Sequence, residues 1–327
     1  MPYLIIFSIS IYVILSKLIL EQNLFALELI SILSLMGLII YSTVIHSRER
    51  EQNIAPIITI PEKVESPVIG YLSDVGLVRS IDEDSILVIN SNPQNPNIIS
   101  RQLLIVADGV GGHSKGEIAS YLGVKKVAEV IFPWISRVGV DKMFSTIIQG
   151  SIAEANKSIL EYTKDHPECE GMGTTMTLAL IDDSTIYIGH VGDTRAYLIN
   201  EGSITRLTKD HSQVQELIDK GEITEEEALN HPKRNVITRV VGYYSEVECD
   251  LITRKINIGD RLLICCDGLT NYVRDAELKE SVIFNEPQTA CKLLVDLANQ
   301  RGGSDNISVI ITPEIHVMQG KTNILLQ

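Results

Sequence analysis

Three aspartates stand where long apolar runs of the sequence meet a turn signal. Asp108 and Asp267 follow the runs LLIVA and LLICC, and Asp305 comes directly before the run NISVIIT. Apolar runs of this length indicate buried β-strands, and a carboxylate at a strand end is held rigidly at the edge of the sheet. Several such carboxylates that converge form an oxygen-rich site for hard divalent cations. The sequence therefore predicts a metal-dependent hydrolase.

Four further polar residues fit the same chemistry. Arg79, Glu83 and Asp84 precede another apolar run, and Asp193 occupies a Gly-Asp turn between two β-rich segments. Two cations that share a bridging carboxylate can polarise a water molecule into a nucleophile and clamp a phosphoryl group. An arginine beside them can bind two phosphate oxygens. No serine, cysteine or histidine stands in a nucleophile motif, so we expect phosphate-ester hydrolysis without a covalent intermediate.

Each feature also has an ordinary explanation when it is taken alone. An Asp-Gly pair after a strand is most often only a turn. The glycine-rich residues 109–116 lack the Gly-Lys-Ser/Thr ending of a nucleotide-binding loop. Cys265 stands where an aspartyl-phosphate phosphatase needs its nucleophilic aspartate, two residues before Asp267. The combination of motifs, and no single one, favours the metal site.

Composition narrows the class of protein. The formal net charge is −14, which disfavours a nucleic-acid-binding surface. The five cysteines are odd in number and irregularly spaced, which predicts reduced thiols in a cytosolic compartment rather than a disulfide framework or a zinc site.

The amino-terminal residues differ from the rest of the chain. Residues 4–20 and 24–45 are two long apolar stretches, each about long enough to span a bilayer as a helix. A cleaved signal peptide is the alternative, but the first stretch has no basic start and no small-residue cleavage site. Arg48 and Arg50 follow the second stretch, so the positive-inside rule places both ends of a membrane hairpin in the cytoplasm. The predicted organisation is a transmembrane helical hairpin (1–46), a linker (47–67), a catalytic domain (68–313) and a carboxyl-terminal tail (314–327).

Strand and helix patterns alternate in blocks along the predicted domain. Closely spaced strands indicate antiparallel pairing, and helices that follow in pairs indicate layers packed outside the sheets, so we expect an α+β fold. We expect strands at 85–90, 101–107, 174–181, 185–191, 195–200, 247–256, 261–266 and 306–312, and helices at 115–132, 139–164, 211–230, 275–283 and 286–300.

The order of the motifs resembles the metal-dependent protein phosphatase family of type 2C, in its bacterial form. The resemblance implies a β-sandwich of two mainly antiparallel sheets flanked by helical pairs. It also implies removal of phosphate from phosphoserine and phosphothreonine with two, possibly three, ions of manganese or magnesium. The matching segments are SDVGLVRSIDED (73–84), ADGVGGH (107–113), GMGTTMTLAL (171–180), HVGDTRAY (190–197), NVITRVVG (235–242), CDGLTNYV (266–273) and SDNISVI (304–310).

The resemblance also assigns roles to individual residues. It makes Asp108 the carboxylate that bridges two metals and Gly109 a ligand through its carbonyl, with Asp267 and Asp305 completing the shell. Further roles follow for Asp193 (a third, weaker metal, together with Asp267), Glu83 and Asp84 (metal contact through water), Arg79 (substrate phosphate), Thr174 and Thr175 (a polar pair near the cleft) and residues 208–234 (a mobile flap).

Two positions depart from the family pattern. Asp82 stands where many bacterial members have asparagine, which adds a negative charge near the site. Val110 replaces the histidine that eukaryotic members use as general acid, and His113 belongs to the glycine-rich turn.

The complete prediction is a serine/threonine phosphoprotein phosphatase tethered to the cell membrane, with its catalytic domain in the cytoplasm. Its expected partners are phosphoproteins, the substrates of a serine/threonine kinase, and the membrane through residues 4–20 and 24–45. The alternative is a catalytically silent membrane scaffold that binds phosphoproteins. Manganese calorimetry separates the two, because a silent member has no need to keep mutually repelling carboxylates together.

Overall fold

The computed structural model describes residues 58–59, 69–91, 101–111, 115–137 and 139–315, which belong to the compact unit Ala55–Gln327. The predicted membrane hairpin, most of the predicted linker and nearly all of the tail lie outside these residues. Among the described residues, no helix is both long and apolar enough to cross a bilayer. The hairpin therefore stays a prediction.

One sheet has seven strands, six of them in the order β1-β3-β4-β6-β7-β10, while β5 pairs with β4. Its strands are β1 (Ile58–Thr59), β3 (Asp84–Ser91), β4 (Arg101–Val110), β5 (Gly173–Thr174), β6 (Met176–Asp182), β7 (Thr185–Val191) and β10 (Asp250–Lys255). All neighbours are antiparallel except β1, which runs parallel to β3. β1 lies in the segment predicted as a linker, where no strand was expected.

The second sheet has five strands in the order β2-β12-β11-β8-β9, all antiparallel. Its strands are β2 (Gly70–Asp74), β8 (Arg195–Ile199), β9 (Ile204–Arg206), β11 (Arg261–Cys265) and β12 (Ile307–Ile311). Because β2 pairs with β12, the sheet joins the beginning of the described domain to its end.

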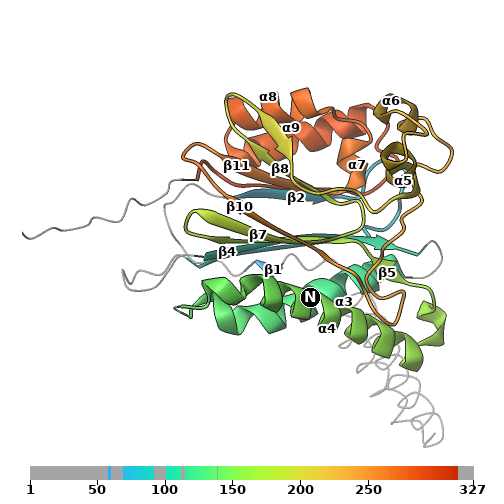
Figure 1. The fold of residues 1–327 in the computed structure, drawn as a ribbon. Helices are drawn as coiled ribbons and strands as arrows, with labels where there is room; N and C mark the ends of the chain where they lie inside the picture. Colours follow the sequence, from blue (N-terminus) through green and yellow to red (C-terminus); the bar gives the residue numbers. More distant parts are fainter. Residues whose placement is uncertain (1–57, 60–68, 92–100, 112–114, 138, 316–327) are drawn as a thin grey trace, which may run out of the picture. The chain divides into compact units, whose positions relative to one another are not determined.

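The two sheets form the middle of the fold and helices cover their outer faces (Figure 1). α3 (Gly116–Ile135) and α4 (Phe144–Asp165) pack on the seven-stranded sheet, and α8 (Asp275–Phe284) and α9 (Pro287–Gln300) pack on the five-stranded sheet. A third apolar core fills the space between the sheets. This arrangement confirms the predicted α+β class with helical pairs outside mainly antiparallel sheets.

Strand β4 shows why its sequence is a continuous apolar run. Leu103 and Ile105 face the core beneath the helices, while Leu104 and Val106 face the core between the sheets. A strand that is covered on both faces cannot alternate apolar and polar residues, so every position from 103 to 107 is apolar.

Several boundaries differ from the expectation. β4 continues through Asp108 to Val110, so the prediction that this strand stops on the carboxylate is wrong: β5 extends the pairing by two residues. The predicted helix at 211–230 is two short helices, α5 (Gln213–Asp219) and α6 (Glu225–Ala228). β2 and β9 were not predicted. Short pieces complete the list: η1 (Asp141–Met143), η2 (Pro167–Cys169) and α7 (Asp267–Thr270).

Candidate metal and phosphate site

Asp84 and Asp108 are brought together by the register of β3 and β4, which places their Cα atoms directly opposite each other. Asp84 is buried and Asp108 is half-buried. Ligand atoms of both residues and of Cys266 lie within 4.8 Å of one another. The thiol of Cys266 is fully buried, and burial and the neighbouring carboxylates raise its pKa well above the ordinary value. A protonated thiol is a poor ligand, so the two carboxylates are the metal-binding candidates of this group.

Asp193, Asp267 and Asp305 reach the same region and line one cavity. Asp193 lies in the turn between β7 and β8, Asp267 is the first residue of α7, and Asp305 precedes β12. Asp267 comes close to Asp305 because Gly268 packs against the backbone of Asn306, where a Cβ would overlap the Asn306 carbonyl. Asp84, Asp193, Asp267 and Asp305 all act electrostatically on Asp108, so the structure brings the five predicted aspartates together.

Electrostatics confirm that these carboxylates are crowded. Burial raises the pKa of Asp84 and of Asp108 well above the ordinary range, and repulsion by neighbouring aspartates adds to it. The pKa of Asp193 is raised in the same way, by burial and then by Asp267. Burial followed by repulsion from Asp305 raises the pKa of Asp267. Such a cluster is stable in its charged form only when cations neutralise it.

The hydrogen-bonding state of the cluster agrees with metal binding. Within the described residues, both carboxylate oxygens of Asp84 and Oδ1 of Asp193 are buried without a well-formed hydrogen bond. Buried polar atoms normally have partners, and an ion is a common reason for an exception. Carboxylate and carbonyl oxygens are the donors that magnesium and manganese prefer. The residues present therefore fit the predicted hard divalent cations.

Gly109 occupies a position that only glycine can fill. A Cβ there would overlap the backbone of Gly116 and come within 2.5 Å of the carbonyl oxygen of Glu83. The Gly109 amide donates to that same Glu83 carbonyl, at 3.1 Å. These contacts hold the end of β4, the start of α3 and the residues before β3 together beside Asp108.

Thr174 and Thr175 lie behind Asp108 and hold its backbone. The hydroxyl of Thr174 donates to the Asp108 carbonyl at 2.9 Å. The Asp108 amide donates to Thr175 Oγ1 at 3.2 Å, and the Thr175 amide donates back to the Asp108 carbonyl at 2.8 Å. Both threonines are fully buried, so they position the aspartate rather than face the cavity.

Arg79 lies at the edge of the carboxylate cluster. Its Nη2 is 3.0 Å from a carboxylate oxygen of Asp305, and its Nη1 is 3.4 Å from Glu83. The side chain is exposed, so its guanidinium is accessible to a phosphate that approaches the cluster. Glu83 is half-buried, and burial raises its pKa.

Asn306 is a positioning residue that the sequence analysis did not single out. Its Nδ2 donates to the carbonyls of Val75 at 3.0 Å and Ile81 at 2.9 Å, and its Oδ1 accepts from the Glu83 amide at 2.9 Å. The loop that carries Arg79 is therefore fixed by the residue that follows Asp305.

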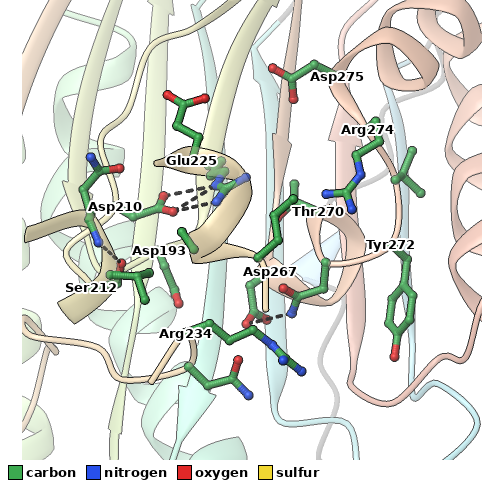
Figure 2. Close-up of a pocket in the computed structure, with 18 of the residues that line it drawn as sticks. Asp193, Asp210, Ser212, Glu225, Arg234, Asp267, Thr270, Tyr272, Arg274 and Asp275 are labelled. Carbon is green, nitrogen blue, oxygen red and sulfur yellow. Dashed lines mark hydrogen bonds and ion pairs between the residues drawn. The ribbon is translucent and has the colours of Figure 1, made fainter. Parts of the chain in front are cut away.

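A cavity of about 610 Å³ adjoins the cluster and is shown in Figure 2. Asp193 and Asp267 lie near each other on its wall, and Arg234 and Arg274 reach it from two other segments. α5 and α6 line it, so part of the stretch 208–234, predicted as a flap, borders the cavity.

An ion-pair network around the buried Asp210 carboxylate holds the base of the predicted flap, and the sequence pattern did not indicate it. Asp210 accepts from Arg195 at 2.7 Å and pairs with Arg206. The His211 amide donates to the Gly192 carbonyl at 2.7 Å, and the Gly192 amide donates to His211 Nδ1 at 3.0 Å. The flap is thus bonded to the turn that carries Asp193.

The departures from the family pattern are partly visible. Asp82 accepts from the Ser73 hydroxyl at 2.6 Å and from the Asp84 amide at 3.1 Å, so its added charge is hydrogen-bonded. Burial is the largest cause of the raised pKa of Asp84, and the charge of Asp82 is the next largest. Val110 is the last residue of β4. His113 lies outside the described residues.

All five cysteines are free thiols, as predicted.

Comparison with known proteins agrees with the geometry. The model of the family described as Protein phosphatase 2C matches residues 73–217. The chain is 34% identical to the serine/threonine phosphatase stp of Listeria innocua over 254 residues, which cover 77% of this chain and 97% of that protein.

Two solved structures have the same fold. The serine/threonine phosphatase Stp1 from Staphylococcus aureus aligns with a TM-score of 0.68 at 32% identity, covering 80% of this chain and 99% of that one. The catalytic domain of the phosphatase PstP, in complex with two manganese ions, aligns with a TM-score of 0.65 at 34% identity, covering 76% and 98%. The chain belongs to the protein phosphatase 2C family and is a protein serine/threonine phosphatase.

Proposed function

We propose that this chain hydrolyses phosphoserine and phosphothreonine in proteins with two or three manganese or magnesium ions held by its aspartates. The observation that carries the proposal is the convergence of five carboxylates beside an exposed arginine, with buried carboxylate oxygens that lack well-formed hydrogen bonds. The family implies metal dependence, and a related phosphatase was solved with two manganese ions.

The oxygen ligands divide between the two sheets. Asp108, with the carbonyl of Gly109, offers ligands from β4 of one sheet. Asp267 and Asp305 offer carboxylates from the ends of β11 and β12 in the other sheet, while Asp193 would hold the third ion together with Asp267. Glu83 and Asp84 would contribute through bound water. The bound ions would supply Lewis acidity, which activates water near neutral pH and neutralises phosphoryl charge.

Arg79 provides the substrate-binding charge. Its guanidinium pairs with a carboxylate oxygen of Asp305 at 3.0 Å. A phosphate bound beside this pair would therefore lie within reach of both the guanidinium and the metal-binding cluster. A planar guanidinium can bind two phosphate oxygens at once and orient the ester for attack in line with the leaving oxygen. The hydrogen bonds of Asn306 keep the loop, and with it Arg79, in place.

Substitution of Asp108 tests this proposal. Asp108→Asn removes the central charge, and we expect kcat for p-nitrophenyl phosphate with manganese to fall by at least about 100-fold. Asp183→Asn is the matched control, because Asp183 is an exposed turn residue with φ 51°, a conformation that asparagine also tolerates. Wild-type turnover by Asp108→Asn, with or without manganese, would refute the metal assignment.

We also propose that residues 4–20 and 24–45 anchor the enzyme in the cell membrane with the catalytic domain in the cytoplasm. Two apolar stretches separated by three residues, with arginines after the second, support this topology. Full-length protein is expected in the membrane fraction, and a variant without residues 1–46 in the supernatant after ultracentrifugation. Recovery of the full-length protein in the supernatant would contradict the anchor.

A further inference from the structure

Three large apolar side chains are exposed in the loop between β2 and β3. The exposed fractions are 68% for Leu77, 69% for Val78 and 51% for Ile81. Single exposed apolar residues are ordinary on a protein surface, but neighbouring ones commonly mark a binding surface. These three residues, here named the apolar rim, stand on both sides of Arg79 in the sequence.

The loop holds the apolar rim in place. The Leu77 amide donates to the Gly303 carbonyl at 2.7 Å, and the Ile81 carbonyl accepts from Asn306 at 2.9 Å. The Gly76 amide donates to Asp74 Oδ1 at 2.9 Å, which closes the turn before Leu77. Both ends of the loop are hydrogen-bonded to the body of the domain. The loop backbone therefore loses little conformational entropy when a ligand binds the rim.

The apolar rim also borders the catalytic cavity. A Cβ on Gly303 would lie 3.0 Å from Leu77 Cγ, so Leu77 rests against the residue before Ser304. Ser304 and Asp305 both line the cavity. Through Leu77, the rim therefore adjoins the wall of the site.

A phosphoprotein substrate has to pass over this surface. When the substrate phosphate is bound at Arg79, each residue beyond the phosphorylated one lies about 3.3 Å further along the extended substrate chain. Leu77 contacts Gly303, Arg79 pairs with Asp305, and the Ile81 carbonyl accepts from Asn306, so the rim and the arginine lie along the same segment 303–306. A substrate segment beside the phosphate would therefore lie next to the apolar rim.

We propose that the apolar rim is a specificity subsite, which binds an apolar side chain one or two positions from the phosphoserine or phosphothreonine of the substrate. This rests on the proposed function, in which Arg79 binds the substrate phosphate. A lipid surface fits the rim less well, because Leu77 rests against Gly303 beside the wall of the cavity, which an extended peptide can follow and a flat bilayer surface cannot.

The test compares two phosphopeptides that differ only beside the phosphoserine, one with leucines at the flanking positions and one with serines. Burial of one leucine side chain corresponds to a preference of roughly tenfold in kcat/KM. We expect the full-length enzyme with manganese to prefer the leucine peptide by that factor. In Leu77→Ser/Ile81→Ser the ratio should fall to about one, through a higher KM for the leucine peptide.

A matched control is Leu293→Ser, because Leu293 is 47% exposed on α9 and lines a different cavity. That variant should keep the tenfold preference. Equal kcat/KM of the wild type for both peptides, or an unchanged preference in the double variant, would overturn the subsite.

Two further outcomes are distinguishable. Phosphatidylglycerol vesicles could stimulate hydrolysis of both peptides equally, with the stimulation lost in the double variant. That result would show that the rim contacts a membrane and would overturn the proposal. Absence of manganese-dependent turnover of p-nitrophenyl phosphate by the wild type would instead refute the proposed function, which the subsite needs.

Discussion

Asn306 shows how a single side chain can determine the geometry of this site. It fixes the Arg79 loop through Val75, Ile81 and Glu83, which lie more than 220 residues earlier in the chain. The sequence places Asn306 within a recognisable motif but carries no sign of these partners, because hydrogen bonds across such a separation follow only from strand pairing. The aspartates were predictable because their type and motif spacing are local signals.

The first prediction concerns Asn306→Ala. The substitution removes three hydrogen bonds, so we expect the free energy of unfolding to fall by about 1–3 kcal/mol and Arg79 to lose its fixed position. KM for phosphopeptides should rise and inhibition by inorganic phosphate should weaken.

Thermal unfolding measures the loss of stability, and steady-state kinetics measure KM and the inhibition by phosphate. The control is Asn200→Ala, because Asn200 makes a comparable set of hydrogen bonds to Gly202, Ser203 and Asp260 away from the cavity. Asn200→Ala should lose stability but keep wild-type phosphate inhibition. Equal phosphate inhibition in both variants would contradict a positioning role of Asn306.

At the scale of elements, the flap differs most from its prediction. The polar periodicity at 211–230 predicts one helix, but the chain ends α5 near Gly221, which adopts φ 71°, and starts α6 with a capping box between Thr224 and Glu227. Both signals are visible in the sequence. β2 and β9 were missed because short strands carry too few residues for a clear alternation.

The second prediction concerns the base of the flap. Asp210→Ala leaves Arg195 and Arg206 without their buried carboxylate, and removal of one partner from such a network costs about 3 kcal/mol of stability. Because the flap is bonded to the turn of Asp193, kcat/KM for phosphopeptides should fall as well.

Denaturant unfolding and peptide kinetics test this. Glu201→Ala, at the exposed turn between β8 and β9, is the control and should leave both quantities unchanged. A stability of Asp210→Ala within about 0.5 kcal/mol of wild type would show that the network does not hold the flap.

At the scale of the whole molecule, the sandwich explains why acidic residues far apart in the chain meet. β4 brings Asp108 from the seven-stranded sheet, and β11 and β12 lead to Asp267 and Asp305 in the five-stranded sheet. The layered α+β class followed from hairpin spacing and paired helices. The strand order within each sheet did not follow from the sequence, because the pairing of β2 with β12 joins the two ends of the domain.

The third prediction concerns pH and metal together. The pKa values of Asp84, Asp108 and Asp193 are raised by burial and repulsion above the ordinary value near 4. Between that value and the raised native-state pKa, the native state binds more protons than the unfolded chain. The free energy of unfolding of the metal-free protein therefore falls as pH rises through this window.

Manganese competes with these protons, so its stabilising effect should grow with pH. Differential scanning calorimetry is expected to show a larger manganese-induced rise in Tm at about pH 8 than at about pH 5. Asp183→Asn should behave as wild type and Asp267→Asn should lose most of the rise. An identical rise at both pH values would contradict the protonated state of the cluster.

The most direct measurement is anomalous X-ray diffraction from crystals grown with manganese. The account predicts anomalous peaks enclosed by Asp108, Asp267 and Asp305, with a weaker peak beside Asp193, and Arg79 at the open side of the cluster. Anomalous peaks elsewhere, or a cluster without manganese in crystals of active enzyme, would contradict the central claim that these carboxylates hold the catalytic ions.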